Sequence, residues 1–337
     1  MSNLNKTTHQ ISVQESFVNN IFDEATDRNA FIFNLFKLQY QQNTVYKAWC
    51  DALNKTSNNI DSITNIPFLP ISFFKTHTVV NGAFEPQVIF ESSGTTQTIN
   101  SKHLVKDVSL YEQSFLKAFE HFYGDINDWC VLGLLPSYLE RSGSSLVFMV
   151  EEFIKRSSIK ESGFYLYDHE KLANILQQLK AKKQKTLLIG VTFGLLDFAE
   201  AFPMPLQHTI IMETGGMKGR RRELTRHEVH SQLKTAFNVD AIHSEYGMTE
   251  LLSQAYSKGE GRFVCPPWMK VLVRDEEDPL LVKEYGQGIL NVIDMANVYS
   301  CPFIATDDVG KVYEDGSFEV WGRLDNSDIR GCSLLVV

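Results

Sequence analysis

The five-residue segment Tyr246-Gly247-Met248-Thr249-Glu250 combines an aromatic ring, a glycine turn, a hydroxyl and a carboxylate, directly after a strand-like segment. An aromatic face can stack on a base, and a hydroxyl can donate to a phosphate. A carboxylate beside phosphate groups is a typical Mg²⁺ ligand. The segment therefore indicates a nucleotide site in which Thr249 contacts phosphate and Glu250 holds Mg²⁺. The alternative is a solvated loop that closes onto a helix.

A loop of small and hydroxyl-bearing residues follows the strand-like segment Gln87–Phe90. Such a loop presents backbone N–H groups and hydroxyls to an oxyanion, which is what phosphate binding requires. The sequence matches neither GxxxxGK[ST] nor GxGxxG, so a plain turn is the alternative. His103, downstream, can contact a phosphate or serve a structural role. The candidate phosphate-binding residues are Ser92, Ser93, Gly94, Thr95 and Thr96.

Two further sets of residues could contact the base and the ribose of a nucleoside. The pair Gly215-Gly216 allows the backbone to approach a flat ligand closely. Asp308 can accept hydrogen bonds from both hydroxyls of a ribose, with Arg323 beside it. Asp and Gly are also common in hairpin turns, which is the alternative for these segments.

Composition excludes several classes of protein. The chain has 337 residues and a formal net charge of −9, whereas proteins that grip nucleic-acid phosphates usually carry positive charge. Its apolar runs are far shorter than the ~20 residues of a membrane-spanning helix, and Met1–Asn20 lacks a signal-peptide pattern. Its 5 cysteines include no CxxC pair, which argues against a disulfide framework. We expect a cytoplasmic protein with no nucleic-acid partner and no membrane span.

The elements that must position these residues alternate in type. Apolar strand-like segments such as Trp129–Leu135 and Thr186–Val191 are separated by amphipathic helical segments. This alternation predicts an α/β fold with mostly parallel sheets covered by helices. We expect a single domain with a helical N-terminal segment (1–85), a nucleotide-binding α/β part (86–253) and a β-rich antiparallel tail (254–337).

Taken in order, these segments resemble the adenylate-forming superfamily of acyl-CoA synthetases and related ligases, which implies the fold of that superfamily's N-terminal domain. Ser92–Thr96 is similar to its phosphate loop, with Gln97 where glycine is usual. Tyr246–Glu250 is similar to its aromatic-Gly-x-Thr-Glu motif. The resemblance further assigns Gly215 and Gly216 to the adenine, Asp308 to the ribose, and Arg323 and Asp325 to the arginine and hinge aspartate of the GRxD motif.

A closer resemblance, over almost the whole chain, is to the acyl-protein synthetases of bacterial bioluminescence, the LuxE family. It rests on four strings in the same order, Ile66–Lys75, Pro266–Trp268, Asp307–Gly310 and Gly331–Leu334. That family lacks the small C-terminal lid domain of the superfamily, and we expect the lid to be absent here. Lys102 and Lys75 are then the candidates for the role of the lid's catalytic lysine.

The resemblance implies that the chain uses ATP and Mg²⁺ to convert a carboxylic acid into an acyl-adenylate. Cys332 is similar to the family's acyl-carrying cysteine, and a thiolate is a good acyl acceptor. A partner protein (a reductase or a carrier protein) and CoA are the other possible acceptors. Apolar residues such as Phe193, Leu195 and Met248 favour a pocket for a fatty or aryl acid.

Two alternatives stay open at this point. One is a lid-less acyl- or aryl-CoA ligase similar to the phenylacetate-CoA ligases. The other is a catalytically silent subunit that binds a nucleotide or an acyl group. ATP–pyrophosphate exchange separates both enzymes from the silent subunit, and the identity of the thiol acceptor separates the two enzymes.

Overall fold

The computed structural model describes residues 13–92, 99–136, 143–215 and 224–324. Its helices are α1 (Val13–Asn20), α2 (Arg28–Gln42), α3 (Thr44–Ala52), α4 (Phe73–Thr76), α5 (Val108–Tyr123), α6 (Ser145–Arg156), α7 (His169–Ala181), α8 (Thr192–Ala201) and α9 (Arg226–Phe237), with short 3₁₀ turns η1 (Ile63–Asn65) and η2 (Ile126–Asp128). The strands of the first two thirds of the chain are β1 (Leu69–Pro70), β2 (Val88–Glu91), β3 (Lys102–Val105), β4 (Cys130–Leu134), β5 (Gly163–Phe164), β6 (Thr186–Val191), β7 (Thr209–Thr214) and β8 (His243–Tyr246). The later strands are β9 (Ala255–Ser257), β10 (Arg262–Val264), β11 (Met269–Arg274), β12 (Val282–Lys283), β13 (Gly286–Asp294), β14 (Phe303–Val312) and β15 (Phe318–Arg323).

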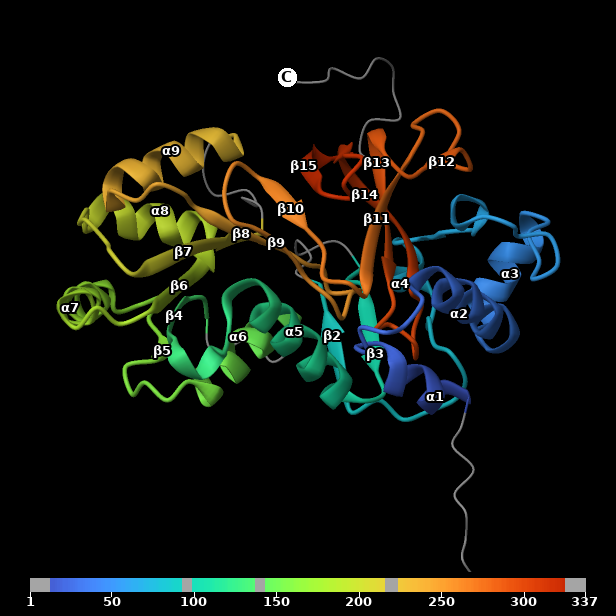
Figure 1. Cartoon of the computed structure of the whole chain (residues 1–337), viewed down its shortest axis with the longest axis horizontal. Helices are drawn as coiled ribbons and strands as arrows, with labels where there is room; N and C mark the ends of the chain where they lie inside the picture. Colours follow the sequence, from blue (N-terminus) through green and yellow to red (C-terminus); the bar gives the residue numbers. More distant parts are fainter. Residues whose placement is uncertain (1–12, 93–98, 137–142, 216–223, 325–337) are drawn as a thin grey trace, which may run out of the picture.

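Thirteen of the described strands belong to one mixed sheet. Its order is β12-β11-β13-β14-β15-β10-β9-β8-β7-β6-β4-β5, and β1 pairs with β14 off this path. The strands from β5 to β8 are parallel, and the sheet becomes antiparallel from the β8–β9 pair onward. In Figure 1 the parallel part lies on the left and the antiparallel part on the right, with β9 and β10 between them.

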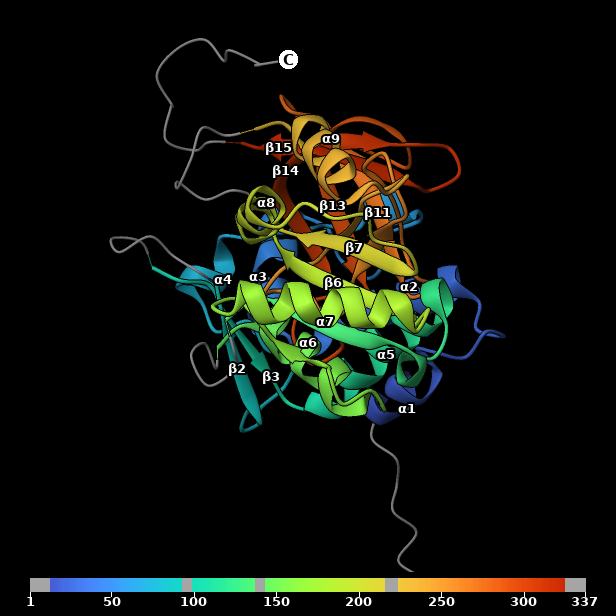
Figure 2. The ribbon, with the colours of Figure 1, turned by 90° about the vertical axis from the view of Figure 1, so that its left-hand side faces the viewer.

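Helices cover the parallel strands on both faces, as Figure 1 shows: α8 and α9 lie on one side of β6 and β7, and α5 and α6 lie on the other. Two apolar clusters correspond to these faces. One packs α7, α8 and α9 against the sheet, and the other continues from α5 and α6 to the N-terminal helices and the antiparallel strands. Figure 2 shows α7 in front of the strands when the molecule is seen from the side of β5.

Local sequence accounts for the ends of the covering helices. Asp107 accepts a hydrogen bond from the backbone of Ser109 at the start of α5, and Gly124 ends that helix with a φ of 85°. Thr225 and Glu228 form a reciprocal capping box at the start of α9. Such side chains satisfy backbone groups that a helix terminus leaves unpaired, so each helix begins at a fixed residue.

The predicted α/β architecture and the β-rich antiparallel tail are confirmed, with two differences in detail. The strand predicted at 87–90 is β2, which pairs with β3 in a separate antiparallel hairpin. The sheet is also mixed, since the parallel and antiparallel parts are joined through β8 and β9.

The β14–β15 hairpin offers a matched test of strand packing. A Cβ on Gly310 would lie 2.0 Å from the carbonyl oxygen of Glu319, whereas a Cβ on Gly322 would meet nothing within 4 Å. We expect Gly310→Ala to lower the free energy of unfolding by ~3 kcal/mol, because the clash is with backbone and the strands must separate. Gly322→Ala should change it by no more than about 0.5 kcal/mol. Urea denaturation of both variants measures the difference, and equal stabilities would contradict this packing.

Candidate nucleotide and acyl site

The tertiary structure joins three of the residues that the sequence singles out. Tyr246, at the end of β8, donates from its hydroxyl to Asp308 Oδ2 over 2.8 Å. Arg323, on β15, donates from Nε to Asp308 Oδ1 over 3.1 Å. Asp308 is buried on β14 opposite Arg323 in the strand register, while the Arg323 side chain is about half exposed. One carboxylate thus holds together groups from β8, β14 and β15.

Tyr246 is tightly packed as well as hydrogen-bonded. Its ring centroid lies 5.8 Å from that of Phe263 and 5.3 Å from that of Phe318. Burial raises the pKa of Tyr246 well above its ordinary value, and the neighbouring charge of Asp308 raises it further. The phenol is therefore a fixed neutral donor to Asp308. Stacking of this ring on a base stays a prediction.

The residues after Tyr246 form a loop that is buried from Glu250 onward, and its backbone is held by distant side chains. Asp294, at the end of β13, accepts hydrogen bonds from the backbone N–H groups of Leu252 (2.7 Å) and Ser253 (3.0 Å). Asn297 donates from Nδ2 to the carbonyl of Glu250 over 2.8 Å. Because buried backbone groups need partners, these contacts fix the path of the loop that carries Thr249 and Glu250.

His103 supports the same loop from β3. Its Nδ1 lies 2.8 Å from the carbonyl oxygen of Thr249, and its Nε2 lies 3.0 Å from Asn297 Oδ1. Burial lowers the pKa of His103 to about 4, with the hydrogen bonds to Thr249 and Asn297 acting in the opposite direction. Of the two roles considered for His103, these contacts match the structural one.

Glu250 is the acidic residue proposed to hold Mg²⁺. Its side chain is buried, and burial raises its pKa, while a hydrogen bond with Ser101 and the charges of Arg323 and Lys75 oppose the increase. Mg²⁺ is commonly bound by one or two carboxylates together with substrate phosphates, and the single buried carboxylate of Glu250 fits that pattern. No cluster of three or more metal-ligating side chains occurs in the described part of the chain.

The two candidate lysines differ in their surroundings. Lys102 Nζ lies 3.6 Å from Glu91 Oε1 on the neighbouring strand β2, and its side chain is 60% exposed. Lys75, on α4, lies close enough to Glu250 for its charge to oppose the increase in that carboxyl's pKa. Of the two lysines, Lys75 therefore has an electrostatic effect on the candidate metal ligand, whereas Lys102 is paired with Glu91.

The structure describes only the ends of the candidate phosphate loop. The backbone N–H of Ser92 donates to the carbonyl of Ser101 over 3.1 Å, and the hydroxyl of Ser92 accepts from the N–H of Ser101 over 2.9 Å. This pairing closes the loop at the mouth of the β2–β3 hairpin and sets Ser101 against Glu250. Some residues of the predicted site lie outside the described part of the chain, namely Ser93, Gly94, Thr95, Thr96, Gly216, Asp325 and Cys332.

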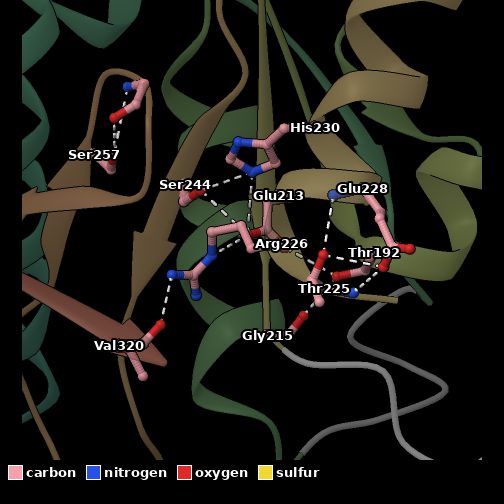
Figure 3. A network of polar contacts seen from close by, with 11 residues as sticks. Thr192, Glu213, Gly215, Thr225, Arg226, Glu228, His230, Ser244, Ser257 and Val320 are labelled. Atoms are coloured by element: carbon pink, nitrogen blue, oxygen red, sulfur yellow. Dashed lines mark hydrogen bonds and ion pairs between the residues drawn. The ribbon is translucent and has the colours of Figure 1, made fainter. Parts of the chain in front are cut away.

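A polar network behind the site was not found from the sequence (Figure 3). Glu213, on β7, accepts from the hydroxyl of Thr192 over 2.9 Å and from Arg226 Nε over 3.3 Å. Thr192 also donates to the carbonyl of Gly215 over 2.8 Å, and Arg226 donates to the carbonyl of Val320 over 3.0 Å. The network thereby anchors the glycine turn after β7 and ties β7 to β15, the strand that carries Arg323.

Charge keeps this network together despite its burial. Burial by itself raises the pKa of Glu213, but a hydrogen bond from His230, the Arg226 cation and the Thr192 hydroxyl together lower it. Glu213 is therefore a buried carboxylate paired with a cation. The spacing of these residues matches no motif, so the only sequence signal was an acidic residue at the end of an apolar strand.

The described cysteines are poor nucleophiles. Burial raises the pKa of Cys130 to about 11 and those of Cys50 and Cys265 to about 12, and it also raises that of Cys301. Since the thiolate is the reactive form, these thiols are inert near neutral pH. Cys265 and Cys301 therefore lack the environment of an acyl acceptor.

Two residues named for an apolar substrate pocket differ in environment. Leu195 is fully buried in the cluster formed by α7, α8, α9 and the sheet, and its place in a substrate pocket stays a prediction. It faces the core because α8 turns its apolar side toward β6 and β7. Met248 is only partly buried and packs against the edge of the other cluster.

Two bacterial proteins are similar to this chain over most of its length. The sequence is 24% identical to the long-chain-fatty-acid–luciferin-component ligase of Aliivibrio fischeri, over 93% of this chain and 89% of that protein. It is 22% identical to the Vibrio harveyi protein of the same name, over 89% of this chain and 84% of that one. No protein-family model matches the sequence.

Solved structures show the same fold. ATP-bound MatB from Rhodopseudomonas palustris superposes with a TM-score of 0.54 at 18% identity, over 72% of this chain and 49% of MatB. A 2-hydroxyisobutyryl-CoA ligase in its postadenylation state superposes with a TM-score of 0.61 at 11% identity, over 90% of this chain and 69% of that one. The fold is that of the adenylate-forming enzymes. The predicted resemblance to the LuxE-type acyl-protein synthetases is confirmed by the two bacterial relatives.

Within the adenylate-forming fold, this chain covers only part of the larger enzymes. It spans about half the length of MatB but most of the length of the two luciferin-component ligases, 89% and 84%. Among the residues that the structure describes, no helix is long and apolar enough to cross a membrane.

Glu245, the residue before the Tyr246–Glu250 motif, is a titratable group that sequence analysis missed. Burial raises its pKa to about 8, and the nearby carboxylate of Glu213 adds to the increase. Tyr111 on α5 and Tyr256 on β9 face the same group, since its charge contributes, after burial, to raising their pKa values. The Glu245 carboxyl is therefore largely protonated at neutral pH.

This shift predicts a pH dependence of stability. The folded protein retains a proton on Glu245 up to about pH 8, whereas the unfolded chain releases it near ~4.3. Between these values the folded state binds more protons, so the free energy of unfolding falls as pH rises. We expect Glu245→Gln to lack this component, so that its stability relative to wild type increases from pH 5 to about 8.

Urea denaturation across that pH range measures the effect. The control is Glu284→Gln, since Glu284 is paired with Lys270 near the surface over 2.9 Å and lies away from β8. A constant difference between wild type and Glu245→Gln across the range would show that Glu245 has an ordinary pKa.

Proposed function

We propose that this chain uses ATP to activate a carboxylic acid of the fatty-acid type and passes the acyl group to a protein thiol. The observation that carries the proposal is the convergence of Tyr246, Asp308 and Arg323 beside Glu250, in a chain related to fatty-acid ligases. In this proposal Asp308 accepts from the ribose hydroxyls, and its position is fixed by Tyr246 and Arg323.

The reaction has two steps. First, a carboxylate oxygen of the acid attacks the α-phosphorus of ATP, the bond to the β-phosphate oxygen breaks, and pyrophosphate leaves an acyl-adenylate behind. Second, a thiolate attacks the acyl carbon, the bond from that carbon to the AMP oxygen breaks, and AMP departs. Mg²⁺ would neutralise charge on the phosphates. Such displacements depend on positioning and charge stabilisation, which fixed groups provide without reorganisation.

The roles of the chain's own residues follow from their surroundings. Thr249 and Glu250 are presented to the phosphates by a loop that Asp294 and Asn297 hold in place. Lys75 supplies positive charge near Glu250 and takes the role for which Lys102, paired with Glu91, is less suited. The hydroxyl-rich segment from Ser92 to Thr96 supplies further donors, Gly215 and Gly216 border the adenine, and Asp325 follows Arg323 as the hinge residue.

The second step needs a thiol that accepts the acyl group. The four described cysteines are held as neutral thiols by burial. This leaves Cys332 within the chain, or the thiol of a partner reductase, a carrier protein or CoA. Cys332 is the acceptor we propose, because it occupies the tail string that resembles the acyl-carrying cysteine of the family.

The first test addresses Glu250. We expect wild type to catalyse Mg²⁺-dependent, acid-stimulated ATP–pyrophosphate exchange, and Glu250→Gln to reduce it by ~10²-fold or more, because a fixed charge next to the phosphates is lost. Isotope exchange measures this, with Glu284→Gln as a matched control that keeps wild-type activity. Unchanged exchange in Glu250→Gln would remove Glu250 from the metal role.

The second test addresses Cys332. After incubation with ATP, Mg²⁺ and a substrate acid, we expect the wild type to gain one acyl mass that hydroxylamine removes, because a thioester is labile to that reagent. Cys332→Ser should still catalyse pyrophosphate exchange but form no hydroxylamine-labile adduct. Cys265→Ser is the matched control and should label like wild type. Acyl transfer to added CoA or to a carrier thiol, with Cys332 unmodified, would favour the CoA-ligase alternative.

A further inference from the structure

Three polar side chains form a row across the sheet at the end of β8. The strand register pairs Thr214 of β7 with Glu245 of β8, and Glu245 with Tyr256 of β9. Residues paired in this way point to the same face of a sheet, so the three side chains stand next to one another. This face is the one covered by α5, since Tyr256 packs on Phe122 at a centroid distance of 5.4 Å.

A fourth polar side chain, that of Gln254, joins the row at Gly247. A Cβ built on Gly247 would lie 2.4 Å from Glu245 Oε1 and 3.4 Å from Gln254 Cγ. The side chains of Glu245 and Gln254 therefore converge on the glycine of the nucleotide motif. The four residues Thr214, Glu245, Gln254 and Tyr256 are called the polar row below.

Most of the polar row is buried without hydrogen-bond partners. Thr214, Gln254 and Tyr256 are 0%, 3% and 1% exposed. Among the described residues, Thr214 Oγ1, Gln254 Oε1 and the Tyr256 hydroxyl have no hydrogen-bond partner. Each buried polar group left in this condition costs about 1–3 kcal/mol, so a group of them in one place calls for an explanation.

The position of the row relates it to the proposed reaction. Thr214 is the last residue of β7, and Glu245 precedes Tyr246, so the row lies at the carboxyl ends of the parallel strands, where α/β sheets bind ligands. Tyr246 points to the opposite face of β8, toward Asp308. The nucleotide contacts and the polar row are thus on the two sides of one strand.

We infer that the acid activated by this chain carries a hydrogen-bond donor, a hydroxyl or an ammonium group, on its carbon chain, and that Glu245, Gln254, Tyr256 and Thr214 bind that group. The inference rests on the proposed function and names its substrate class more narrowly. Gln254 Oε1 can only accept a hydrogen bond, and the hydroxyls of Thr214 and Tyr256 can both accept and donate. The partner that satisfies all of them is a donor.

The residues next to the polar row are aromatic, and they suit the aliphatic part of such an acid. Tyr256 is flanked by the rings of Phe122 and Tyr123, with centroid distances of 5.4 Å and 5.5 Å. Tyr111 donates its hydroxyl to the carbonyl of Ser145 and so presents its ring rather than a free donor. Aromatic rings beside a small polar cluster favour an aliphatic chain with one polar substituent. They disfavour a sugar acid, because most of its hydroxyls would have no hydrogen-bond partner.

The test compares acids in pyrophosphate exchange with the full chain. Straight-chain aliphatic acids are assayed beside analogues of the same length that carry a hydroxyl or an amino group at each successive carbon. We expect at least one substituted acid to exceed its unsubstituted parent in kcat/KM by ~10²-fold or more, because a site that hydrogen-bonds a substrate group rejects analogues without it.

Variants connect the preference to the polar row. Tyr256→Phe should reduce the ratio of kcat/KM between the preferred acid and its parent by about tenfold, the effect of one lost hydrogen bond. Tyr46→Phe is the matched control, since this buried tyrosine of α3 donates its hydroxyl to the carbonyl of Pro67, and it should leave that ratio unchanged. Glu245→Gln distinguishes the two donors, since a bound ammonium group would favour the ionised form of the Glu245 carboxyl, which an amide cannot replace, whereas an amide still accepts from a hydroxyl.

Thermal unfolding gives a readout independent of catalysis. Tyr256→Phe should not lower Tm, because its hydroxyl has no protein partner to lose, whereas Tyr46→Phe should lower it. Equal use of substituted and unsubstituted acids, or a ratio unchanged in Tyr256→Phe, would overturn this inference alone. Absence of exchange with every acid would overturn the proposed function, and this inference with it.

Discussion

The site depends on how one buried loop satisfies its backbone hydrogen bonds. The turn between β8 and β9 is buried from Glu250 to Gln254, where unpaired N–H and carbonyl groups are costly. Asp294 accepts from two consecutive N–H groups of this turn, and Asn297 donates to the carbonyl of Glu250. His103 contacts the carbonyl of Thr249 from a third element. Were any of these lost, Thr249 and Glu250 would no longer have a defined position.

The same turn explains why the parallel and antiparallel parts of the sheet meet where they do. β8 is the last parallel strand, and β9 returns beside it in the opposite direction. Asp308 on β14 then reaches Tyr246 on β8, and Arg226 connects Glu213 on β7 to the backbone of β15. Each contact crosses between the two parts of the sheet, so the geometry of the proposed nucleotide site requires both parts to be folded.

The side chains on the two faces of β8 differ in charge and in hydrogen bonding. On one face, Tyr246 and Ser244 point toward charged partners, Asp308 and Glu213, whose charges are balanced by Arg323 and Arg226. On the other face, the polar row is uncharged at neutral pH and incompletely hydrogen-bonded. The paired face is suited to fixing strands and a nucleotide. The polar groups buried without partners on the other face lower the stability of the fold. Such unfavourable groups are common where a protein binds a ligand.

The sequence by itself determined the elements and the local motifs. Alternating apolar and amphipathic segments predicted the α/β part, and the composition of Tyr246–Glu250 indicated its chemistry, because both are properties of neighbouring residues. The tertiary structure alone decided which distant residues hold the site. His103 contacts Thr249 across 146 positions, Asp294 contacts Leu252 across 42, and Glu245 meets Tyr256 only through strand pairing. No periodicity marks such partners, since hydrogen bonds between remote residues depend on how strands and turns pack in space.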